Sequence, residues 1–363
     1  MAQHIRMNTK KRVLVALSGG VDSSVSAMLL LEAGYAVEGA FIKTWTAPWI
    51  PCTWKEERRD AMRVAAELHI PFHTVDLSKE YEEKVVQYLV DEYRKGRTPN
   101  PDVMCNKYIK FGSFFEWAIN KKFDFVATGH YARVESVKTE STNTEYHLLS
   151  GIDTEKDQTY FLWNLTQEQL SRTLFPVGHL TKAEVRSHAH RRGLVTASKK
   201  DSQGVCFLGK INMKDFLSHY IPIRKGDVLD TQGTIIGTHD GAEFLTLGQR
   251  HGFSVFLKSP DSPPLYVVEK NISNNTVIVS ERDISLPSSP HTIPLTEVHW
   301  IAKPAEYCQA RLRYRQKLFS VTVTSHPLKG YSVTPHEVQP YVSEGQSIVF
   351  YSGDICLGGG ILG

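Results

Sequence analysis

Cysteine is scarce in this 363-residue sequence, and the few cysteines are irregularly spaced. They are Cys52, Cys105, Cys206, Cys308 and Cys356, and no two of them form a CxxC pair. A disulfide framework or a zinc ribbon needs paired, regularly spaced cysteines, so the sequence argues against both. We therefore assign no metal-ligating residues, and we expect thiols that stay free for chemistry in a reducing compartment.

Long hydrophobic runs are absent as well. The apolar stretch near the N-terminus covers only residues 13–17. No stretch elsewhere approaches the roughly 20 apolar residues of a membrane-spanning helix, and the short stretch is also too brief for the core of a signal peptide. We expect a cytoplasmic protein without a membrane partner.

A large excess of charge is missing too, because the formal net charge is only +3. This value permits a nucleic-acid partner without requiring one, since RNA binding depends on a local basic face. Hydrophobic residues make up 41% of the chain, which is enough for the cores of a soluble globular protein. A chain of this length is expected to form about two or three domains.

In the first 130 residues, short apolar runs alternate with amphipathic stretches. This alternation predicts an α/β fold with a doubly wound parallel sheet, in which ligands bind at the carboxyl ends of the strands. The expected strands are 12–17, 37–42, 72–77 and 123–128, and the expected helices are 22–32, 55–68, 79–93 and 114–119.

The pattern changes after the first part of the chain. The polar stretch 135–145 is typical of a surface loop. Residues 157–220 lack clear strands and predict helices over 165–174 and 181–192. From about residue 224, glycines separate short β-type runs, which predicts one or two small β-barrels. The expected domains are 1–155, a small, mostly helical 156–223, and a β-barrel region 224–363.

A glycine-rich turn, Ser18–Ser24 (SGGVDSS), lies between the first expected strand and helix. Glycines let the backbone approach a phosphate group, and the helix start directs N–H groups at that anion. Ser18, Ser23 and Ser24 can add hydroxyl donors. Asp22 fits either a Mg²⁺ ion that bridges it to phosphates or a helix cap. The turn lacks the Gly-Lys-Ser/Thr ending of a Walker A motif.

Two cysteines lie in unusual polar settings. Cys105 follows two prolines that predict an irregular, stiff segment, with Asp102 three residues before it and Lys107 nearby. Cys206 follows a stretch with two lysines and a glycine, an electropositive setting of the kind that reactive thiols need. The other three cysteines are interpreted as small buried hydrophobic residues.

The sequence resembles a known family through these residues. SGGVDSS is similar to the PP-loop of N-type ATP pyrophosphatases, which split ATP into AMP and pyrophosphate. The further blocks narrow the resemblance to the MnmA/TrmU family of tRNA-specific 2-thiouridylases, and they run in order along nearly the whole chain. These blocks are GRTPNPDVMCNKYIKFG, ATGHYAR, KDQTYFLW, FPVGHLTKAEVR, DSQGVCFLG, LGQRHG, ARLRYRQ and GQSIVFY.

The resemblance implies a role for each matching position. The ATP-contacting positions are Ala16, Leu17, Ser18, Gly19, Gly20, Val21, Asp22, Ser23, Ile42 and Gly129. The segment that meets the target base is Asn100, Pro101 and Asp102, and the tRNA-contacting positions are His130, Lys156, Asp157, Gln158, Arg313, Tyr314 and Gln346. Cys105 matches the nucleophile and Cys206 the cysteine that carries a persulfide. The three domains would then be a PP-loop catalytic domain and two tRNA-binding regions.

The resemblance also implies a mechanism. ATP, with Mg²⁺, would activate the 2-oxygen of the wobble uridine in the anticodon loop of tRNA. A sulfur-carrier protein would load Cys206 with a persulfide, which either attacks the activated carbon or releases sulfide that does so. Cys105 would then form a disulfide with Cys206, and Asp102 would serve as general acid or base. We expect a monomer.

Several features leave other interpretations open. Ile42 replaces a methionine that is usual in the family, Tyr108 replaces a glutamate, and residues 44–54 lack the expected acidic stretch. Arg311, Arg313 and Arg315 alternate, so on a strand they would share one face suited to phosphates. The competing functions are a PP-loop ligase that adenylates a small metabolite, and a non-catalytic tRNA-binding module.

Overall fold

The computed structural model describes residues 10–50, 54–138, 143–200, 212–257, 262–281, 291–328, 330–339 and 342–363. The chain divides into two compact units, which are described separately below. The first unit comprises Met1–Tyr81 and Cys105–Phe207, and the second comprises Glu82–Met104 and Leu208–Gly363. The second unit therefore combines a short segment of the N-terminal third with the C-terminal part of the chain. The predicted domain boundaries at 155 and 223 stay a prediction.

The first unit contains a parallel sheet with the strand order β3-β2-β1-β4-β7. Val13, Leu14 and Val15 are all 0% exposed, so the central strand is covered on both faces, as its continuous apolar run predicts. The four strands expected in this region are confirmed. The strands are β1 (Arg12–Ala16), β2 (Ala36–Lys43), β3 (Phe72–Asp76), β4 (Phe125–Ala127) and β7 (Thr173–Leu174).

Helices cover this sheet where the amphipathic stretches predicted them. Leu30 of one helix and Val64 of the next pack with Val13 and Phe41 of the sheet in one core cluster. Residues 79–93 are helical as expected, but they include a wider π-helical turn. The helices of the first unit are α1 (Val21–Glu32), α2 (Trp54–Glu67), α3 (Ser78–Tyr81), α6 (Phe114–Asn120) and α8 (Lys182–Arg191). The next helices along the chain after α3, η1 (Glu82–Val86) and α4 (Gln87–Arg94), belong to the second unit.

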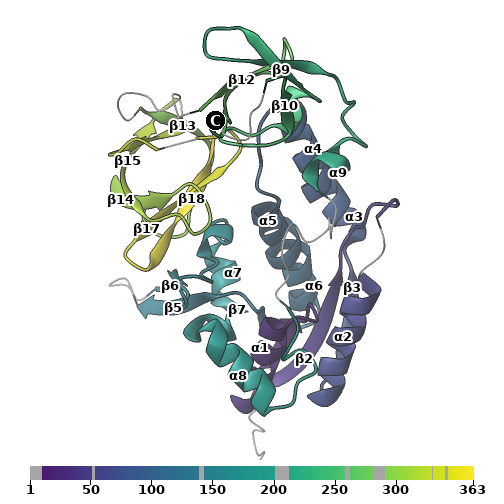
Figure 1. Cartoon of the computed structure of the whole chain (residues 1–363). Coiled ribbons are helices and arrows are strands. Elements are labelled where there is room, and N and C mark those ends of the chain that lie inside the picture. The colour runs from purple at the N-terminus through teal and green to yellow at the C-terminus, as the bar shows by residue number, and fades with distance from the viewer. Residues whose placement is uncertain are drawn as a thin grey trace, which may run out of the picture. The chain divides into compact units, whose positions relative to one another are not determined.

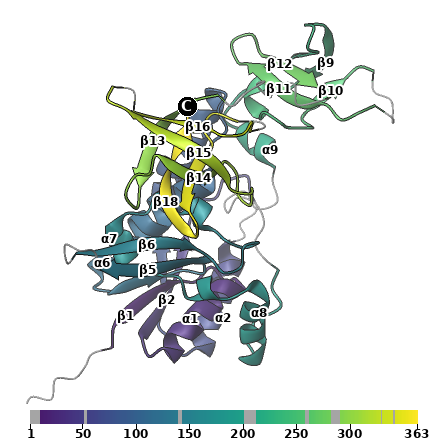
Figure 2. The same cartoon turned by 90° about the vertical axis from the view of Figure 1, so that its left-hand side faces the viewer.

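Two predictions for the first unit are wrong. The stretch predicted as a surface loop, 135–145, belongs largely to an antiparallel hairpin of β5 (Ala132–Lys138) and β6 (Thr144–Ser150) (Figure 2). The helix expected over 165–174 is only α7 (Gln167–Ser171), because Thr173 and Leu174 pair with β4 as an edge strand. In both places the pairing partner along the sheet decides the structure, and a local pattern does not reveal it.

The second unit contains a sheet with the order β10-β9-β8-β12-β11. Three of its strands, β9, β10 and β12, are labelled in Figure 1. Val228, Val267 and Val277 are among the residues of its core. The strands are β8 (Gly226–Leu229), β9 (Ile235–His239), β10 (Phe253–Val255), β11 (Tyr266–Asn271) and β12 (Thr276–Ser280), and α9 (Met213–Leu217) precedes them.

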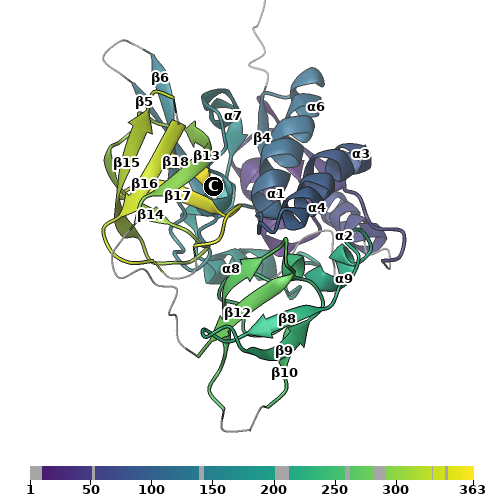
Figure 3. The same ribbon diagram turned by 90° about the horizontal axis from the view of Figure 1, so that it is seen from above.

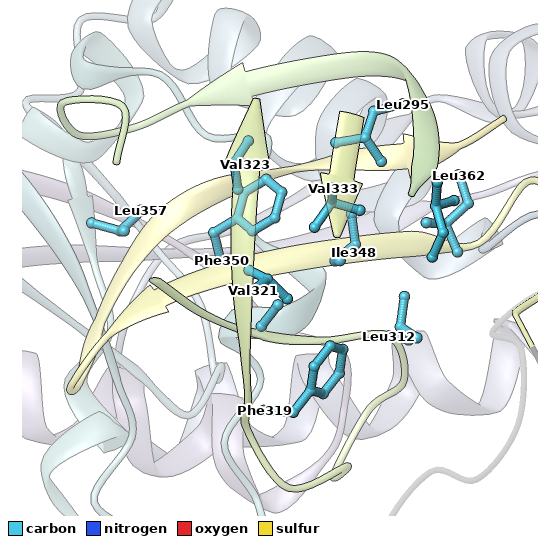
Figure 4. Packing of buried hydrophobic residues seen from close by; sticks show 12 residues of the cluster. Leu295, Leu312, Phe319, Val321, Val323, Val333, Ile348, Phe350, Leu357 and Leu362 are labelled. Carbon is cyan, nitrogen blue, oxygen red and sulfur yellow. The ribbon is translucent and has the colours of Figure 1, made fainter. Parts of the chain in front are cut away.

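The second unit also contains an antiparallel barrel, seen from above in Figure 3. Its strand order is β13-β16-β15-β14-β17-β18, and β13 pairs back with β18 to close the ring. Val321, Ile348 and Phe350 are among the side chains that fill its interior (Figure 4). The strands are β13 (Ile293–Trp300), β14 (Tyr307–Arg311), β15 (Phe319–His326), β16 (Gly330–Pro335), β17 (Ser347–Ser352) and β18 (Ile355–Leu362).

The predicted fold class is thereby confirmed: a parallel α/β sheet, a small central region and a C-terminal β-barrel. Among the described residues, no helix is both long enough and apolar enough to cross a membrane.

Candidate active site

The turn between β1 and α1 has a backbone shape that only glycine suits. Gly19 adopts a φ of +73°, in the left-handed region that other residues rarely enter. A Cβ atom at this position would lie 2.5 Å from the carbonyl oxygen of Glu57 in α2. The turn is therefore pressed closely against α2, and any larger residue at position 19 would displace it.

The first turn of α1 presents backbone N–H groups that no capping side chain satisfies. The N-cap is Gly20, which has no side chain to accept from them. The early N–H groups of a helix have no partner within the helix, and together with the helix dipole they favour an anion. The start of α1 is thus suited to a phosphate group, as the motif predicts.

The hydroxyl groups of this turn serve mainly the turn itself. Ser23 Oγ donates to the carbonyl oxygen of Gly20 at 3.1 Å, and Ser24 Oγ donates to the same oxygen at 2.8 Å. Both serines are buried, whereas Ser18 is exposed. The prediction that all three add donors to a ligand is therefore wrong for Ser24, which is fully buried, and Ser18 is the hydroxyl that solvent reaches.

Asp22 is held by two side chains that the sequence analysis missed. Lys182 Nζ lies 2.8 Å from each carboxylate oxygen, and the Tyr131 hydroxyl donates to Oδ1 at 2.8 Å. Asp22 is therefore not a helix cap, because Gly20 occupies that position. Tyr131 lies in the family-matching block ATGHYAR and Lys182 in FPVGHLTKAEVR, so the resemblance marked both segments. No pattern of neighbouring residues, however, indicates that either side chain contacts Asp22.

Lys182 stands at an electrostatically unfavourable place in its own helix. It is the first residue of α8, where the helix dipole disfavours a cation. Thr181 and Glu184 form a capping box that satisfies this helix start, so Lys182 contributes nothing to capping. Its ammonium group instead puts a positive charge beside the start of α1.

The predicted ATP-contacting positions gather at one edge of the sheet. Ala16 ends β1, Ile42 is near the end of β2, and Gly129 follows β4, so all three lie at carboxyl ends of adjacent parallel strands. A Cβ on Gly129 would lie 2.7 Å from the Ser23 nitrogen, so only glycine lets β4 approach the start of α1. Leu17 and Val21 are buried beneath the turn.

This edge fits the phosphate groups of a nucleotide. It offers unsatisfied helix N–H groups, an exposed hydroxyl and one ammonium group close together. This edge is less suited to a divalent cation, because the Asp22 carboxylate is already paired with the ammonium group of Lys182. Within the described part of the chain, no group of three or more histidine, cysteine, aspartate or glutamate residues could hold a metal ion.

The segment before Cys105 is helical, contrary to the prediction from its prolines. Pro101 begins α5 (Pro101–Met104), and Cys105 begins the π-helical η2 (Cys105–Ser113). Proline suits the first turn of a helix, where its missing N–H would be unbonded in any case. Asn100 Oδ1 accepts from the backbone nitrogens of Asp102 at 3.1 Å and Val103 at 3.3 Å, so its side chain caps the helix.

The two predicted chemical groups of this segment differ in exposure. Asp102 is partly buried and Cys105 is buried, with 3% of its surface exposed. Asn106 anchors the helix that follows by donating from Nδ2 to the carbonyl oxygen of Phe161 at 3.0 Å. The Cys105 thiol is therefore held in a packed helix and not in an exposed loop.

The remaining cysteines are placed unequally. Cys206 and Cys52 lie outside the described residues. Cys356 is buried, and burial raises the pKa of the Cys308 thiol to about 11, so that this thiol stays protonated at neutral pH. The interpretation of Cys308 and Cys356 as unreactive packing residues agrees with these positions.

Several predicted tRNA contacts of the first unit are engaged within the protein. His130 is 7% exposed, and burial, followed by the charge of Lys110, lowers its pKa well below the usual value. Asp157 is buried and accepts from Gly151 N and Thr159 N. Gln158 Oε1 accepts from Tyr131 N, and Lys156 is partly exposed. Their role as tRNA contacts stays a prediction.

The predicted row of arginines on one strand face is wrong. β14 ends at Arg311, whose guanidinium lies over the ring of Tyr351, and the chain then turns. Arg315 has a φ of +65°, which no strand residue adopts, and Gln316 N donates to the carbonyl oxygen of Arg313. Arg313 is exposed and Tyr314 partly exposed on this turn.

Family models agree with the order of the regions along the chain. Three family models match in succession: the tRNA methyl transferase HUP domain over residues 11–210, the tRNA methyl transferase PRC-barrel domain over 214–281, and the aminomethyltransferase beta-barrel domain over 290–362. Among solved structures, the U34-tRNA thiolase NcsA from Methanococcus maripaludis matches 58% of this chain and 65% of its own, with 19% identity and a TM-score of 0.36.

Curated relatives match over nearly the full length. The tRNA-specific 2-thiouridylase MnmA of Enterococcus faecalis is 45% identical over 362 residues, which cover 98% of this chain and 96% of the relative. The enzyme of the same name from Streptococcus thermophilus is 46% identical over 364 residues with the same coverage. On this full-length identity, the chain belongs to the MnmA family of tRNA-specific 2-thiouridylases.

Proposed function

We propose that this protein uses ATP to replace the 2-oxygen of the wobble uridine of tRNA with sulfur, and releases AMP and pyrophosphate. The observation that carries this proposal is the identity of 45% with 2-thiouridylases over 98% of the chain. That alignment spans the anion-suited start of α1 and also the consecutive helices α5, which bears Asp102, and η2, which begins at Cys105. A ligase for small metabolites would need only the first of these features.

ATP supplies an adenylyl group that turns the uridine 2-oxygen into a leaving group. The chain's own contribution is to bind phosphates with the N–H groups at the start of α1 and with the ammonium of Lys182. Tyr131 and Lys182 fix the direction of the Asp22 carboxylate. We further propose that Asp22 would hold a Mg²⁺ ion bound together with ATP, and that this ion would screen the charge of the phosphates.

For sulfur transfer, we propose that a sulfur-carrier protein loads Cys206 with a persulfide. The outer sulfur attacks C2 of the activated uridine, and the oxygen leaves with AMP. The Cys105 thiolate then attacks the inner sulfur, so the electron pair of the S–S bond stays on the new 2-thiouridine. In the alternative order, Cys105 attacks first and frees hydrosulfide, which attacks C2. Either order leaves a Cys105–Cys206 disulfide that a thiol reductant must reopen.

Asp102 is proposed as the general acid or base of these transfers. We propose that Asn100 and Pro101 meet the target base, and that His130, Lys156, Asp157, Gln158, Arg313, Tyr314 and Gln346 contribute to the tRNA site. A monomeric, cytoplasmic protein is part of the same proposal.

The decisive experiment is mass spectrometry of tRNA nucleosides after incubation of the protein with tRNA, ATP and a persulfide-loaded sulfur donor. We expect a nucleoside whose mass gain corresponds to sulfur in place of oxygen. A gain of a methylene group would instead indicate methyl transfer, as the descriptions of two matching family models suggest.

An ATP–pyrophosphate exchange assay with and without tRNA separates the competing functions. The proposed enzyme should show exchange that depends on tRNA. Exchange without tRNA would favour a ligase for a small metabolite, and tRNA binding without exchange would favour a binding module.

A further inference from the structure

One side of the glycine turn lies against two acidic residues of α2. A Cβ atom on Gly19 would lie 2.5 Å from the carbonyl oxygen of Glu57 and 3.2 Å from the Asp60 Cβ. Glu57 and Asp60 are three residues apart in the helix, so their side chains are neighbours on one face. The turn proposed to bind phosphate therefore has two carboxyl groups beside it, and their negative charges disfavour an anion.

The two carboxyl groups interact with one another and with Lys199. Glu57 is exposed as a residue, but protein atoms displace water from its carboxyl group, and this desolvation raises its pKa. The charge of Lys199 lowers the same pKa, and the charge of Asp60 raises it. The three charged groups thus lie within electrostatic reach of one another, and Lys199 offsets the two acids.

Lys199 makes its closest ion pair with Asp60. The lysine Nζ lies 2.8 Å from Asp60 Oδ2, and 34% of the lysine side chain is exposed. Arg63 also pairs with Asp60, but its Nη1 lies 3.4 Å from Oδ1 and 57% of its side chain is exposed. Solvent weakens an exposed pair of this kind, so Lys199 supplies most of the compensating charge.

The backbone around Lys199 is fixed by α8. Arg186 Nη1 donates to the carbonyl oxygens of Ala197 at 3.0 Å and of Lys199 at 3.1 Å. Ala197 belongs to the core cluster that joins Val21 of α1 with Val185 of α8. The segment that ends at Lys199 is therefore held in the same core as the first turn of α1.

Helix α8 thus places two lysines near the glycine turn. Lys182, its first residue, pairs with Asp22 in α1, whereas Arg186 lies one turn further along and holds the backbone of Lys199. Figure 1 shows α8 and α1 in the same part of the first unit. Each lysine meets one carboxylate, so both acids beside the turn, Asp22 and Asp60, are paired with a cation.

We propose that Lys199 is a positioning residue for ATP: it neutralises Asp60, and so keeps the acidic face of α2 from repelling the phosphates of ATP at the start of α1. The inference rests on the proposed use of ATP. It adds a residue to which the family resemblance assigns no role, and this residue acts on the nucleotide through Asp60.

The test compares Lys199→Met with Arg63→Met. Both residues pair with the same carboxylate, and methionine removes the charge of each while keeping an unbranched side chain. Calorimetric titration of the full-length protein with ATP and Mg²⁺ gives the Kd. For Lys199→Met we expect the Kd to rise about tenfold, because an uncompensated charge then faces the phosphates. Arg63→Met should change the Kd by less than about twofold, and Lys199→Arg should bind like the wild type.

A second substitution separates neutralisation from a direct contact with ATP. In the Lys199→Met, Asp60→Asn double variant both charges are removed, so the Kd should return to within about twofold of the wild-type value. The effect of Lys199→Met alone should also shrink between about 0.05 and 0.5 M salt, because salt screens the repulsion. A general loss of packing would be neither rescued nor screened. If Lys199→Met does not fold, Lys199→Gln serves in its place.

An unchanged Kd in Lys199→Met overturns the proposal, and so does an equal rise in Arg63→Met. Failure of Asp60→Asn to restore the affinity would overturn it too, and would identify a direct contact between Lys199 and the nucleotide. If the wild-type protein binds ATP but forms no 2-thiouridine, the proposed function fails, whereas the measured affinities still decide the role of Lys199.

Discussion

The starts of α1 and α5 differ in how the backbone N–H groups of the first helical turn are bonded. At α1 the N-cap is Gly20, and no side chain accepts from the first N–H groups. At α5 the side chain of Asn100 accepts from two of them. The first helix start is left able to bind an anion through its backbone. The first N–H groups of the second helix bond to Asn100, so the roles proposed for this segment fall to the side chains of Asp102 in α5 and Cys105 at the start of η2.

Lys182 strengthens this difference. It stands at the start of α8, against that helix's dipole, and extends its ammonium to Asp22 in the first turn of α1. The backbone site thus receives a cation from another element. Near α5, the contacts fix the backbone instead. Asn100 caps the helix, and the backbone of Thr98 bonds to Glu344 and Gln346.

The largest expected effect comes from removing the thiol of the second site. Cys105→Ser should abolish 2-thiouridine formation, because an alcohol cannot open a persulfide, while ATP–pyrophosphate exchange with tRNA continues. Sulfur should then remain on Cys206, as a disulfide to the tRNA base if the persulfide attacks C2 first, or as a persulfide if Cys105 must act first. Mass spectrometry of alkylated protein distinguishes the two. Cys308→Ser is the matched control and should be fully active. Formation of 2-thiouridine by Cys105→Ser would show that this helix does not supply the nucleophile.

Asp22→Ala should lower the rate of AMP formation about 10²- to 10³-fold, as expected for loss of a preorganised charged group. Lys182→Met should have a similar effect, and the double variant should be little worse than either, because the two side chains act as one pair. Pre-steady-state AMP release measures all three, and circular dichroism checks that they fold. Additive losses would mean that the two residues act separately.

Exchanging the two caps tests the comparison directly. Gly20→Asn is sterically allowed, since its Cβ would meet only Ser18 Oγ at 3.4 Å. The new side chain should satisfy the helix N–H groups, raise stability by about a few tenths of a kcal/mol and increase the KM for ATP roughly tenfold.

The reverse change, Asn100→Ala, should lower the free energy of unfolding by about 1 kcal/mol and leave the KM for ATP unchanged. Urea unfolding and steady-state kinetics measure both variants. An unaltered KM in Gly20→Asn would contradict the anion-binding role of α1.

The smallest effect concerns His130, which follows the glycine packed on α1. Burial lowers the pKa of His130 below its unfolded value, near 6.5, so the unfolded state takes up the proton first. Its contribution to stability is complete above that pH and is lost as the pH falls towards the folded pKa. His130→Gln should therefore flatten the dependence of the unfolding free energy on pH as the pH falls below about 6.5. An unchanged slope would mean that His130 titrates normally.

Much of the first unit could be predicted because its signals are local. The apolar run at residues 12–17 and the glycine turn after it each describe a structure that needs few distant partners. The hairpin of β5 and β6 and the edge strand β7 were missed, because their strands are stabilised by pairing with other segments. The arginine row failed for a related reason: alternation predicts a face only if the strand continues, and β14 ends at Arg311.

The candidate site shows the same division. The residues of the glycine turn were found because the turn is contiguous, whereas Lys182 and Tyr131 lie 160 and 109 residues from Asp22. The two prolines before Cys105 were interpreted as helix breakers, although one of them begins a helix whose cap is the residue before it. Proline excludes a helix interior and equally favours a helix start, so the pattern alone left the choice undecided.

By itself, the sequence determined the parallel α/β sheet, and it located the glycine turn proposed to bind phosphate and the two cysteines proposed for sulfur transfer, because periodicity and contiguous motifs are properties of neighbouring residues. Only the tertiary structure decided that Asp22 pairs with Lys182, that Ser24 serves the turn and not a ligand, and that Gln346 bonds to Thr98 across 248 residues. The long-range contacts join segments that are far apart in the sequence and meet only when the core packs. A local sequence pattern therefore does not reveal them.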